Sequence, residues 1–235
     1  MRKNILYTVL SVLFVPAVSF AQTTNDFGVW SSIGVNKSLS KKLSLEGELE
    51  NRTTDNSSQV SRWGLQLGGS YKVMKFLSIG GAYQFQYYHD LKYSDFQPRN
   101  RFILYTQGKY KWNKFSFSLR ERFQITTKDE SDRIKASGKI DTYRINPSSV
   151  WRNRLKVDYN IPKSRFTPFA SFESFYQLNN PEGNEFEGLR YTIGTGYKIN
   201  KRSFLDFSGI YDKEINTDEP TNRFVISLGY TYNLK

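Results

Sequence analysis

Residues 62–72 read RWGLQLGGSYK, and this stretch decides the fold. Its large apolar side chains, Trp63, Leu65, Leu67 and Tyr71, stand at odd-numbered positions, and small or polar residues fill the even-numbered positions. Because successive side chains of a strand point to opposite sides, this alternation predicts a β-strand with one apolar face and one polar face. A helix would need apolar residues three and four positions apart, and the stretch fails that test.

The same alternation recurs along nearly the whole chain of 235 residues. It is strongest in residues 43–50, 77–87, 101–112, 115–125, 151–159, 189–198 and 223–232. We count about eleven such segments of about 11 to 14 residues, a little more than a tilted membrane strand needs. Bacterial single-chain barrels carry an even number of strands. We therefore expect ten or twelve strands, preferably twelve, with one element misassigned near residues 27–39 or within residues 128–147.

The predicted connections alternate between short and long. The short ones lie at residues 40–42, 73–75, 113–114, 161–165 and 200–202, and the long ones at 54–58, 90–97, 128–147, 179–187 and 216–221. This alternation is typical of up-and-down membrane barrels, in which short turns face the periplasm and long loops face outward.

A soluble barrel of the lipocalin type has the same period but points its apolar face inward. Three features favour a barrel in lipid. The polar face is rich in Gly and Ser, residues 224–234 form an alternating aromatic last strand, and aromatic side chains gather near strand ends, as interfacial girdles do. These girdle candidates are Trp63, Tyr71, Tyr87, Trp112, Trp151, Tyr159, Tyr230 and Tyr232. The composition agrees, because 18 Phe and 16 Tyr accompany a mean hydropathy of only −0.60. The predicted fold is an all-β, transmembrane, antiparallel up-and-down barrel of 10–12 strands.

The first residues predict a signal peptide. Arg2 and Lys3 precede an apolar run at residues 5–20, and Ser19 and Ala21 place small residues at the −3 and −1 positions of a cleavage site. We expect a signal peptide at residues 1–21, cleavage after Ala21, and an outer-membrane barrel at residues 22–235. The chain has no Cys, which excludes a lipoprotein anchor and disulfides.

Two charged residues conflict with the pattern. Glu121 falls mid-strand on the lipid-facing parity, where a carboxylate is costly, so we expect a local bulge or a shift toward the lumen. Lys213 breaks the parity near a loop end, from which its long side chain can reach water.

Charged residues on the polar face separate by strand. A basic wall is predicted from Arg99, Arg101, Arg120, Arg122, Arg152, Arg154 and Lys156, and acidic residues at Glu46, Glu48, Glu50, Glu173, Asp206 and Asp212 lie on other strands. One interpretation is a passage that draws anionic solutes along guanidinium groups. The other is a closed structural barrel, in which arginines and carboxylates pair and hold a narrow lumen shut.

An enzyme at the extracellular rim is a further alternative. Outer-membrane phospholipases use Ser and His at the lipid-facing rim, and His89 is the single His of this chain. No nucleophile motif accompanies His89, so the sequence predicts no catalytic residue. With one His and no Cys it predicts no metal and no cofactor.

Several short motifs suggest a family. Trp30 stands ahead of a Leu-x-Leu-x-x-x-Leu-x-x-Arg segment at residues 43–52, and Arg120-x-Arg122, Arg152-x-Arg154 and Glu173-x-Phe175 follow. Together they resemble an uncharacterised outer-membrane β-barrel family, the domain-of-unknown-function family 2490 type. The resemblance spans most of the mature chain and implies a barrel in the outer membrane. It brings no activity and no catalytic residues. The charged interior is also similar in style to narrow porins for acidic sugars, an analogy that rests on architecture alone.

The formal net charge of +12 is compatible with anionic partners. Secretion argues against nucleic acid. The expected partners are outer-membrane lipid, lipopolysaccharide, the barrel-assembly machinery and anionic solutes.

Overall fold

The computed structural model describes residues 24–217 and 220–234, and the predicted signal peptide lies outside the described residues. The described chain forms eleven strands in one closed sheet, in which each strand pairs with its sequence neighbours and β1 also pairs with β11. The strands are β1 (Thr24–Ser38), β2 (Leu43–Thr54), β3 (Gln59–Lys72), β4 (Leu77–Asp90), β5 (Asp95–Trp112), β6 (Phe115–Lys128), β7 (Ser148–Tyr159), β8 (Phe166–Gln177), β9 (Glu185–Lys198), β10 (Ser203–Glu214) and β11 (Thr221–Leu234). The all-β barrel is confirmed.

The expectation of an even strand number was wrong, and so was that of antiparallel pairing throughout. An odd number of strands leaves the first and last running in the same direction, so β1 and β11 pair in parallel, from Thr24 opposite Thr221 to Lys37 opposite Leu234. In hydrocarbon an unpaired sheet edge would leave N–H and C=O groups without partners, and the parallel ladder removes that edge. Neither suspect region was misassigned: β1 is a full strand, and residues 129–147 add only an isolated bridge between Ile134 and Ile140.

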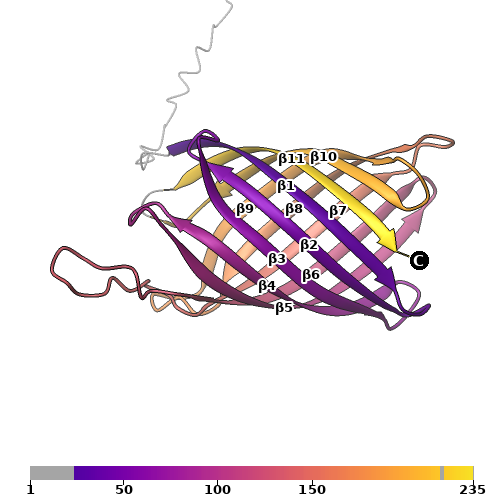
Figure 1. Ribbon diagram of the computed structural model, residues 1–235. Coiled ribbons are helices and arrows are strands. Elements are labelled where there is room, and N and C mark those ends of the chain that lie inside the picture. The colour runs from indigo at the N-terminus through magenta and orange to yellow at the C-terminus, as the bar shows by residue number, and fades with distance from the viewer. Residues whose placement is uncertain (1–23, 218–219, 235) are drawn as a thin grey trace, which may run out of the picture.

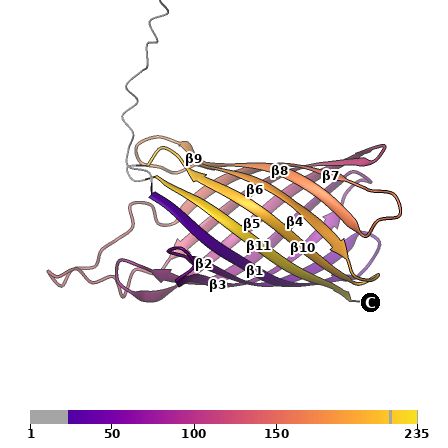
Figure 2. The ribbon, with the colours of Figure 1, turned by 90° about the horizontal axis from the view of Figure 1, so that it is seen from above.

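The strands are strongly tilted, and the two ends of the barrel differ (Figures 1 and 2). Connections at 55–58, 91–94, 129–147 and 178–184, and residues 215–217 after β10, gather at the end where β1 begins. Turns at 39–42, 73–76, 113–114, 160–165 and 199–202 lie at the other end, near the C-terminus. The predicted alternation of short and long connections holds only in part: 129–147 and 178–184 are long, but 55–58 and 91–94 have four residues each, as do 39–42, 73–76 and 199–202 at the other end. Which end faces the periplasm stays a prediction.

The two faces of the sheet have opposite chemistry. Exposed apolar side chains cover the outside, among them Ile33, Leu49, Leu67, Phe102, Leu104, Tyr110, Trp112 and Ile193. Buried polar side chains fill the inside, among them Glu50, Gln84, Gln86, Gln97, Gln124, Arg152 and Glu173. No helix in the described ranges is long and apolar enough to cross a bilayer. An apolar exterior around a polar interior is the arrangement of a barrel whose outer surface meets lipid.

Lumenal glycines make room for large side chains on neighbouring strands. A Cβ at Gly64 would lie 2.8 Å from Cγ of Glu50, and a Cβ at Gly80 would overlap the ring of Tyr105. The Gly-rich polar face of β3 and β4 therefore lets the interior of a small barrel hold bulky residues from β2 and β5.

The expectation for Glu121 was wrong. It keeps its lipid-facing parity in an unbroken register, opposite Thr106 on β5 and Asn153 on β7. The irregularities of the sheet lie elsewhere, at Arg52/Thr53 and Phe175/Tyr176. A hydrogen bond from Nε1 of Trp151 to Oε2 of Glu121, at 2.8 Å, compensates part of the cost of leaving this side chain outside.

Candidate functional site

The predicted basic wall is contiguous, because β5, β6 and β7 are neighbours in the sheet. On β6 and β7 the arginines face each other directly, Arg120 opposite Arg154 and Arg122 opposite Arg152. Like charges directly opposite each other destabilise a sheet. The wall therefore needs negative groups beside it.

Glu173 of β8 supplies one of them. Its carboxylate accepts hydrogen bonds from Arg120 at 3.2 Å and from Arg152 at 2.9 Å, and Arg190 of β9 lies 4.0 Å away. Glu173 is only 4% exposed. A single buried carboxylate thus holds the guanidinium groups of Arg120 and Arg152, whereas Arg190 pairs chiefly with Asp212 of β10 at 2.6 Å.

Glu50 of β2 is the centre of a second cluster. It accepts hydrogen bonds from Arg52 at 2.8 Å, from Arg62 at 3.0 Å and from Nε2 of Gln84 at 3.2 Å. The amide oxygen of Gln84 accepts in turn from Arg101 at 3.4 Å, which links Glu50 to the basic wall.

Sequence reasoning missed four members of this site: Arg52, Arg62, Arg190 and Trp30. The three arginines share the polar parity of their strands, so alternation alone would have found them. The ring of Trp30 lies 3.7 Å from the guanidinium of Arg52 and 4.8 Å from that of Arg190. Trp30 therefore joins the Glu50 cluster to the Glu173 cluster across the β1–β11 pairing.

Several guanidinium groups retain unused donors. The Nε atoms of Arg99, Arg120, Arg122, Arg152 and Arg154 are buried without a hydrogen-bond partner. Within residues 24–217 and 220–234, Arg122 and Arg154 make no ion pair. Buried N–H donors without an acceptor are costly, and a bound anion would compensate them with charge-assisted hydrogen bonds.

The remaining predicted residues lie toward the two ends. Arg99 stacks on Tyr88 at 3.4 Å, and Lys156 pairs with Asp158 at 2.8 Å. Glu46 and Glu48 of β2 form no ion pair within the described part of the chain. They are therefore not part of either arginine cluster.

Cavities open at both ends of the barrel. The cavity at the long-loop end has a volume of about 560 Å³, and its lining includes Arg99, Arg101 and Lys128. The cavity at the short-turn end has a volume of about 610 Å³, and its lining includes Glu46 and Lys109. The two have no lining residue in common. Between the two cavities lie the Glu50 and Glu173 clusters, and Arg101 and Arg190 also line the cavity at the long-loop end. We call this part of the lumen the constriction; it comprises Glu50, Arg52, Arg62, Gln84, Arg101, Arg120, Arg122, Arg152, Arg154, Glu173 and Arg190.

Comparison with known proteins places the chain in a family. The model of the family described as "Protein of unknown function (DUF2490)" matches residues 27–225. The chain belongs to that family. No curated protein matches it. A solved structure of the NanC porin is 12% identical, with a TM-score of 0.49, and the match covers 79% of this chain and 85% of that one. A likeness of this size does not extend the properties of that porin to the DUF2490 chain.

In this DUF2490 barrel the long loop at residues 129–147 is tied to the mouth. Arg133 forms an ion pair with Asp90 at the end of β4, and its Nε donates to the carbonyl of Asp141 at 2.7 Å. The hydroxyl of Tyr143 donates to Asp90 at 3.0 Å and accepts from Arg99 at 3.1 Å. The loop therefore contacts the outermost arginine of the basic wall.

The loop contact is expected to persist in mild acid. Hydrogen bonds from Lys92, Tyr93 and Lys135 hold the pKa of Asp141 well below its usual range. A carboxyl whose pKa is lowered by folding stabilises the fold above its unfolded pKa, and this contribution is lost as the pH falls through the folded pKa. A spin label at Ser137→Cys should therefore keep its mobility from pH 7 down to the ordinary Asp pKa and loosen only below it. In Asp141→Asn the label should already be mobile at pH 7, and equal mobility in both proteins would contradict this role.

The surroundings of His89, the candidate for a hydrolase, are apolar. It faces outward on β4, with its ring stacked on Phe96 at a centroid distance of 4.6 Å. Among the residues that the structure describes, no hydrogen bond joins its ring to a serine or a carboxylate, and its Nδ1 is buried without a partner. The stacking makes His89 part of the apolar exterior near the rim.

Proposed function

We propose that this protein is an outer-membrane channel that passes small anionic solutes through the arginine-lined constriction. The observation that carries the proposal is the surplus of half-buried guanidinium groups at the centre of a closed barrel, with Arg122 and Arg154 unpaired in the described chain. The apolar exterior and the predicted signal peptide support the outer-membrane location.

The chemistry of the constriction favours carboxylate or phosphate over neutral solutes. Guanidinium groups bind such anions through paired hydrogen bonds, and neighbouring arginines on β6 and β7 offer successive binding positions. Conduction requires binding that is strong enough for entry and weak enough for release. Glu50 and Glu173 would make release possible, because they compete with the solute for the same guanidinium groups.

Planar-bilayer recording tests the proposal. Under a KCl gradient the wild-type channel should show an anion-selective reversal potential. Arg122→Ala with Arg154→Ala should move that potential toward zero, because the two unpaired cations are gone. The matched control, Lys139→Ala with Lys163→Ala, removes two exposed charges from connections that line neither cavity, and it should leave the potential unchanged. Conducting wild-type barrels whose selectivity survives the central double substitution would overturn the role of these arginines.

A closed structural barrel is the second candidate function. It is favoured by the ion pairs of Glu50 and Glu173, which link nearby strands along the barrel wall, and by the two separate end cavities. The same recording distinguishes the two functions, because a closed barrel predicts no conductance from correctly folded wild-type protein.

A further inference from the structure

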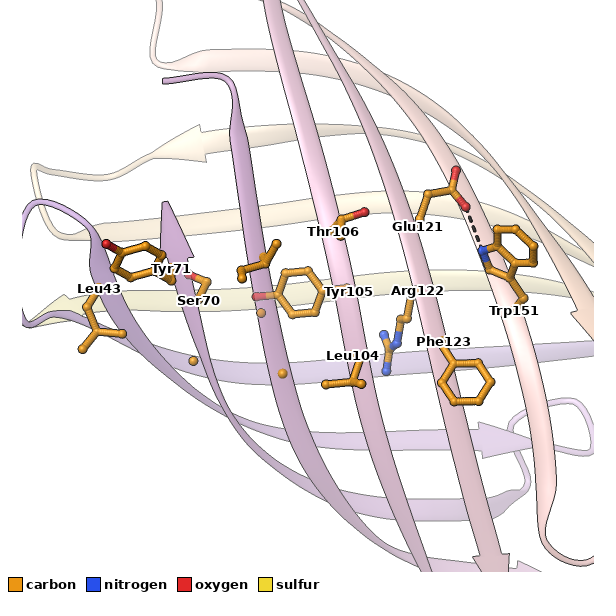
Figure 3. A pocket seen from close by; sticks show the side chains of 14 residues that line it. Leu43, Ser70, Tyr71, Leu104, Tyr105, Thr106, Glu121, Arg122, Phe123 and Trp151 are labelled. Carbon is orange, nitrogen blue, oxygen red and sulfur yellow. Dashed lines mark hydrogen bonds between the residues drawn. The ribbon is translucent and has the colours of Figure 1, made fainter. Parts of the chain in front are cut away.

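A polar row crosses the middle of the outer face of the barrel. Thr106 on β5, Glu121 on β6, Asn153 on β7 and Ser174 on β8 are successive register partners, and all lie on the outward parity. The amide of Asn153 donates to the hydroxyl of Ser174 at 3.4 Å. Figure 3 shows Glu121 with the ring of Trp151 bonded to it and Thr106 on the neighbouring strand. Glu121 stands halfway along β6, where the surrounding lipid would be hydrocarbon.

Hydrocarbon offers no hydrogen-bond partners to the polar side chains of this row. Trp151 bonds one carboxylate oxygen of Glu121, Oε2, and the described chain offers no hydrogen bond to the other oxygen. Ionisable residues at this depth are rare, and they mark a site where another polar group is met. The outward-facing cations Lys37 and Lys213 stand at strand ends, out of reach of the middle of β6.

An apolar groove of about 580 Å³ lies beside the row (Figure 3). Gly69 and Gly81 face each other on β3 and β4, and because they have no side chains the outer surface is recessed there. Leu104 and Phe123 form the wall of the groove on the side toward Glu121. The outer face therefore combines a recess for a bulky side chain with a hydrogen-bonding row at its edge.

We propose that this face binds a second copy of the chain. All copies insert in the same direction, so two of them pack around a two-fold axis parallel to the barrel axis. If that axis passes between β6 and β7, Glu121 of each copy lies opposite the partner's Asn153. The carboxylate is an acceptor and the amide is a donor, so the face is complementary to itself. Lipid acyl chains could fill the groove but would leave Oε1 of Glu121 without a donor.

Native mass spectrometry in mild detergent tests the assembly. Wild-type protein should be dimeric. Glu121→Leu removes both symmetric hydrogen bonds, and each such bond in a membrane contributes on the order of a three- to thirty-fold factor, so the dimer should weaken by at least about ten-fold. Glu121→Gln keeps an acceptor for Asn153 and should remain dimeric. A heat-dependent shift of the band in gel electrophoresis shows that each variant has folded.

Cross-linking locates the interface. The natural chain has no Cys, so single substitutions give one label each. Leu155→Cys, beside Asn153 on β7, should form covalent dimers with a short bis-maleimide in native membranes. Ile33→Cys on β1, across the barrel, is a matched control because the two side chains are 50% and 59% exposed, and it should stay monomeric.

Three outcomes would overturn the proposal. They are a folded wild-type monomer that carries only bound lipid, a dimer of unchanged affinity in Glu121→Leu, and cross-linking through Ile33→Cys but not through Leu155→Cys. None of them depends on whether the lumen conducts.

Discussion

Glu173→Gln is expected to lower the free energy of unfolding of the barrel by about 3–5 kcal/mol, the typical cost of breaking a buried ion pair by removing one partner. The amide keeps the size of the side chain but removes the negative charge that Arg120, Arg152 and Arg190 share. Arg120 and Arg152 would then lose their only ion-pair partner in the described chain, while Arg190 would keep Asp212 at 2.6 Å. Denaturant unfolding from detergent micelles or lipid vesicles, followed by Trp fluorescence, measures the loss.

The matched control is Glu182→Gln, which leaves Arg144 without its partner in the loops. That pair is exposed, at 57% for Arg144 and 74% for Glu182, so its loss should cost less than about 1 kcal/mol. Equal effects of the two substitutions would show that water solvates the Glu173 cluster as fully as the loops. In bilayers, folded Glu173→Gln should also bind anions more tightly, because the competing carboxylate is gone.

The strands and their two faces could be predicted because alternation is a local property. In residues 62–72 it determines both the strand and the side on which each residue lies, and the structure agrees. Closure of the sheet is not local. Whether β1 pairs with β11 in parallel depends on the number of strands, and no residue of β1 encodes that number.

The members of the basic wall were predictable for the same local reason, but their partners were not. Glu173 lies 53 residues from Arg120 in the sequence, and their hydrogen bond depends on which strands are neighbours and in which register. Glu121 shows the converse. Its parity was identified correctly, and the expected bulge was wrong because Trp151, a hydrogen-bond donor on the next strand, keeps the carboxylate outside.

Trp30 is the largest departure from the two-face rule, and Trp30→Ala is expected to cost about 3–5 kcal/mol of folding stability, as for large aromatic side chains elsewhere. An indole on the polar face of β1 belongs to a lumenal apolar cluster with Ile210 and Val225 beside the β1–β11 pairing. Its ring also lies against Arg52 and Arg190. Removing it would leave a cavity at the one parallel pairing of the barrel and remove the aromatic face against which Arg52 and Arg190 lie.

The same denaturant titration measures this loss, and two variants separate its causes. Trp30→Phe keeps an aromatic face for the arginines, so it should recover more than half of the stability that Trp30→Ala loses. Trp112→Ala removes an indole of the outer girdle, 63% exposed, and leaves no lumenal cavity. If Trp112→Ala lowered the free energy of unfolding as much as Trp30→Ala, the loss at position 30 would reflect the removal of apolar surface wherever it lies in the barrel. A larger loss at Trp30 would instead show that the parallel pairing depends on a packed lumen beside it, because the β1–β11 ladder can close only while the side chains behind it hold the two strands in register.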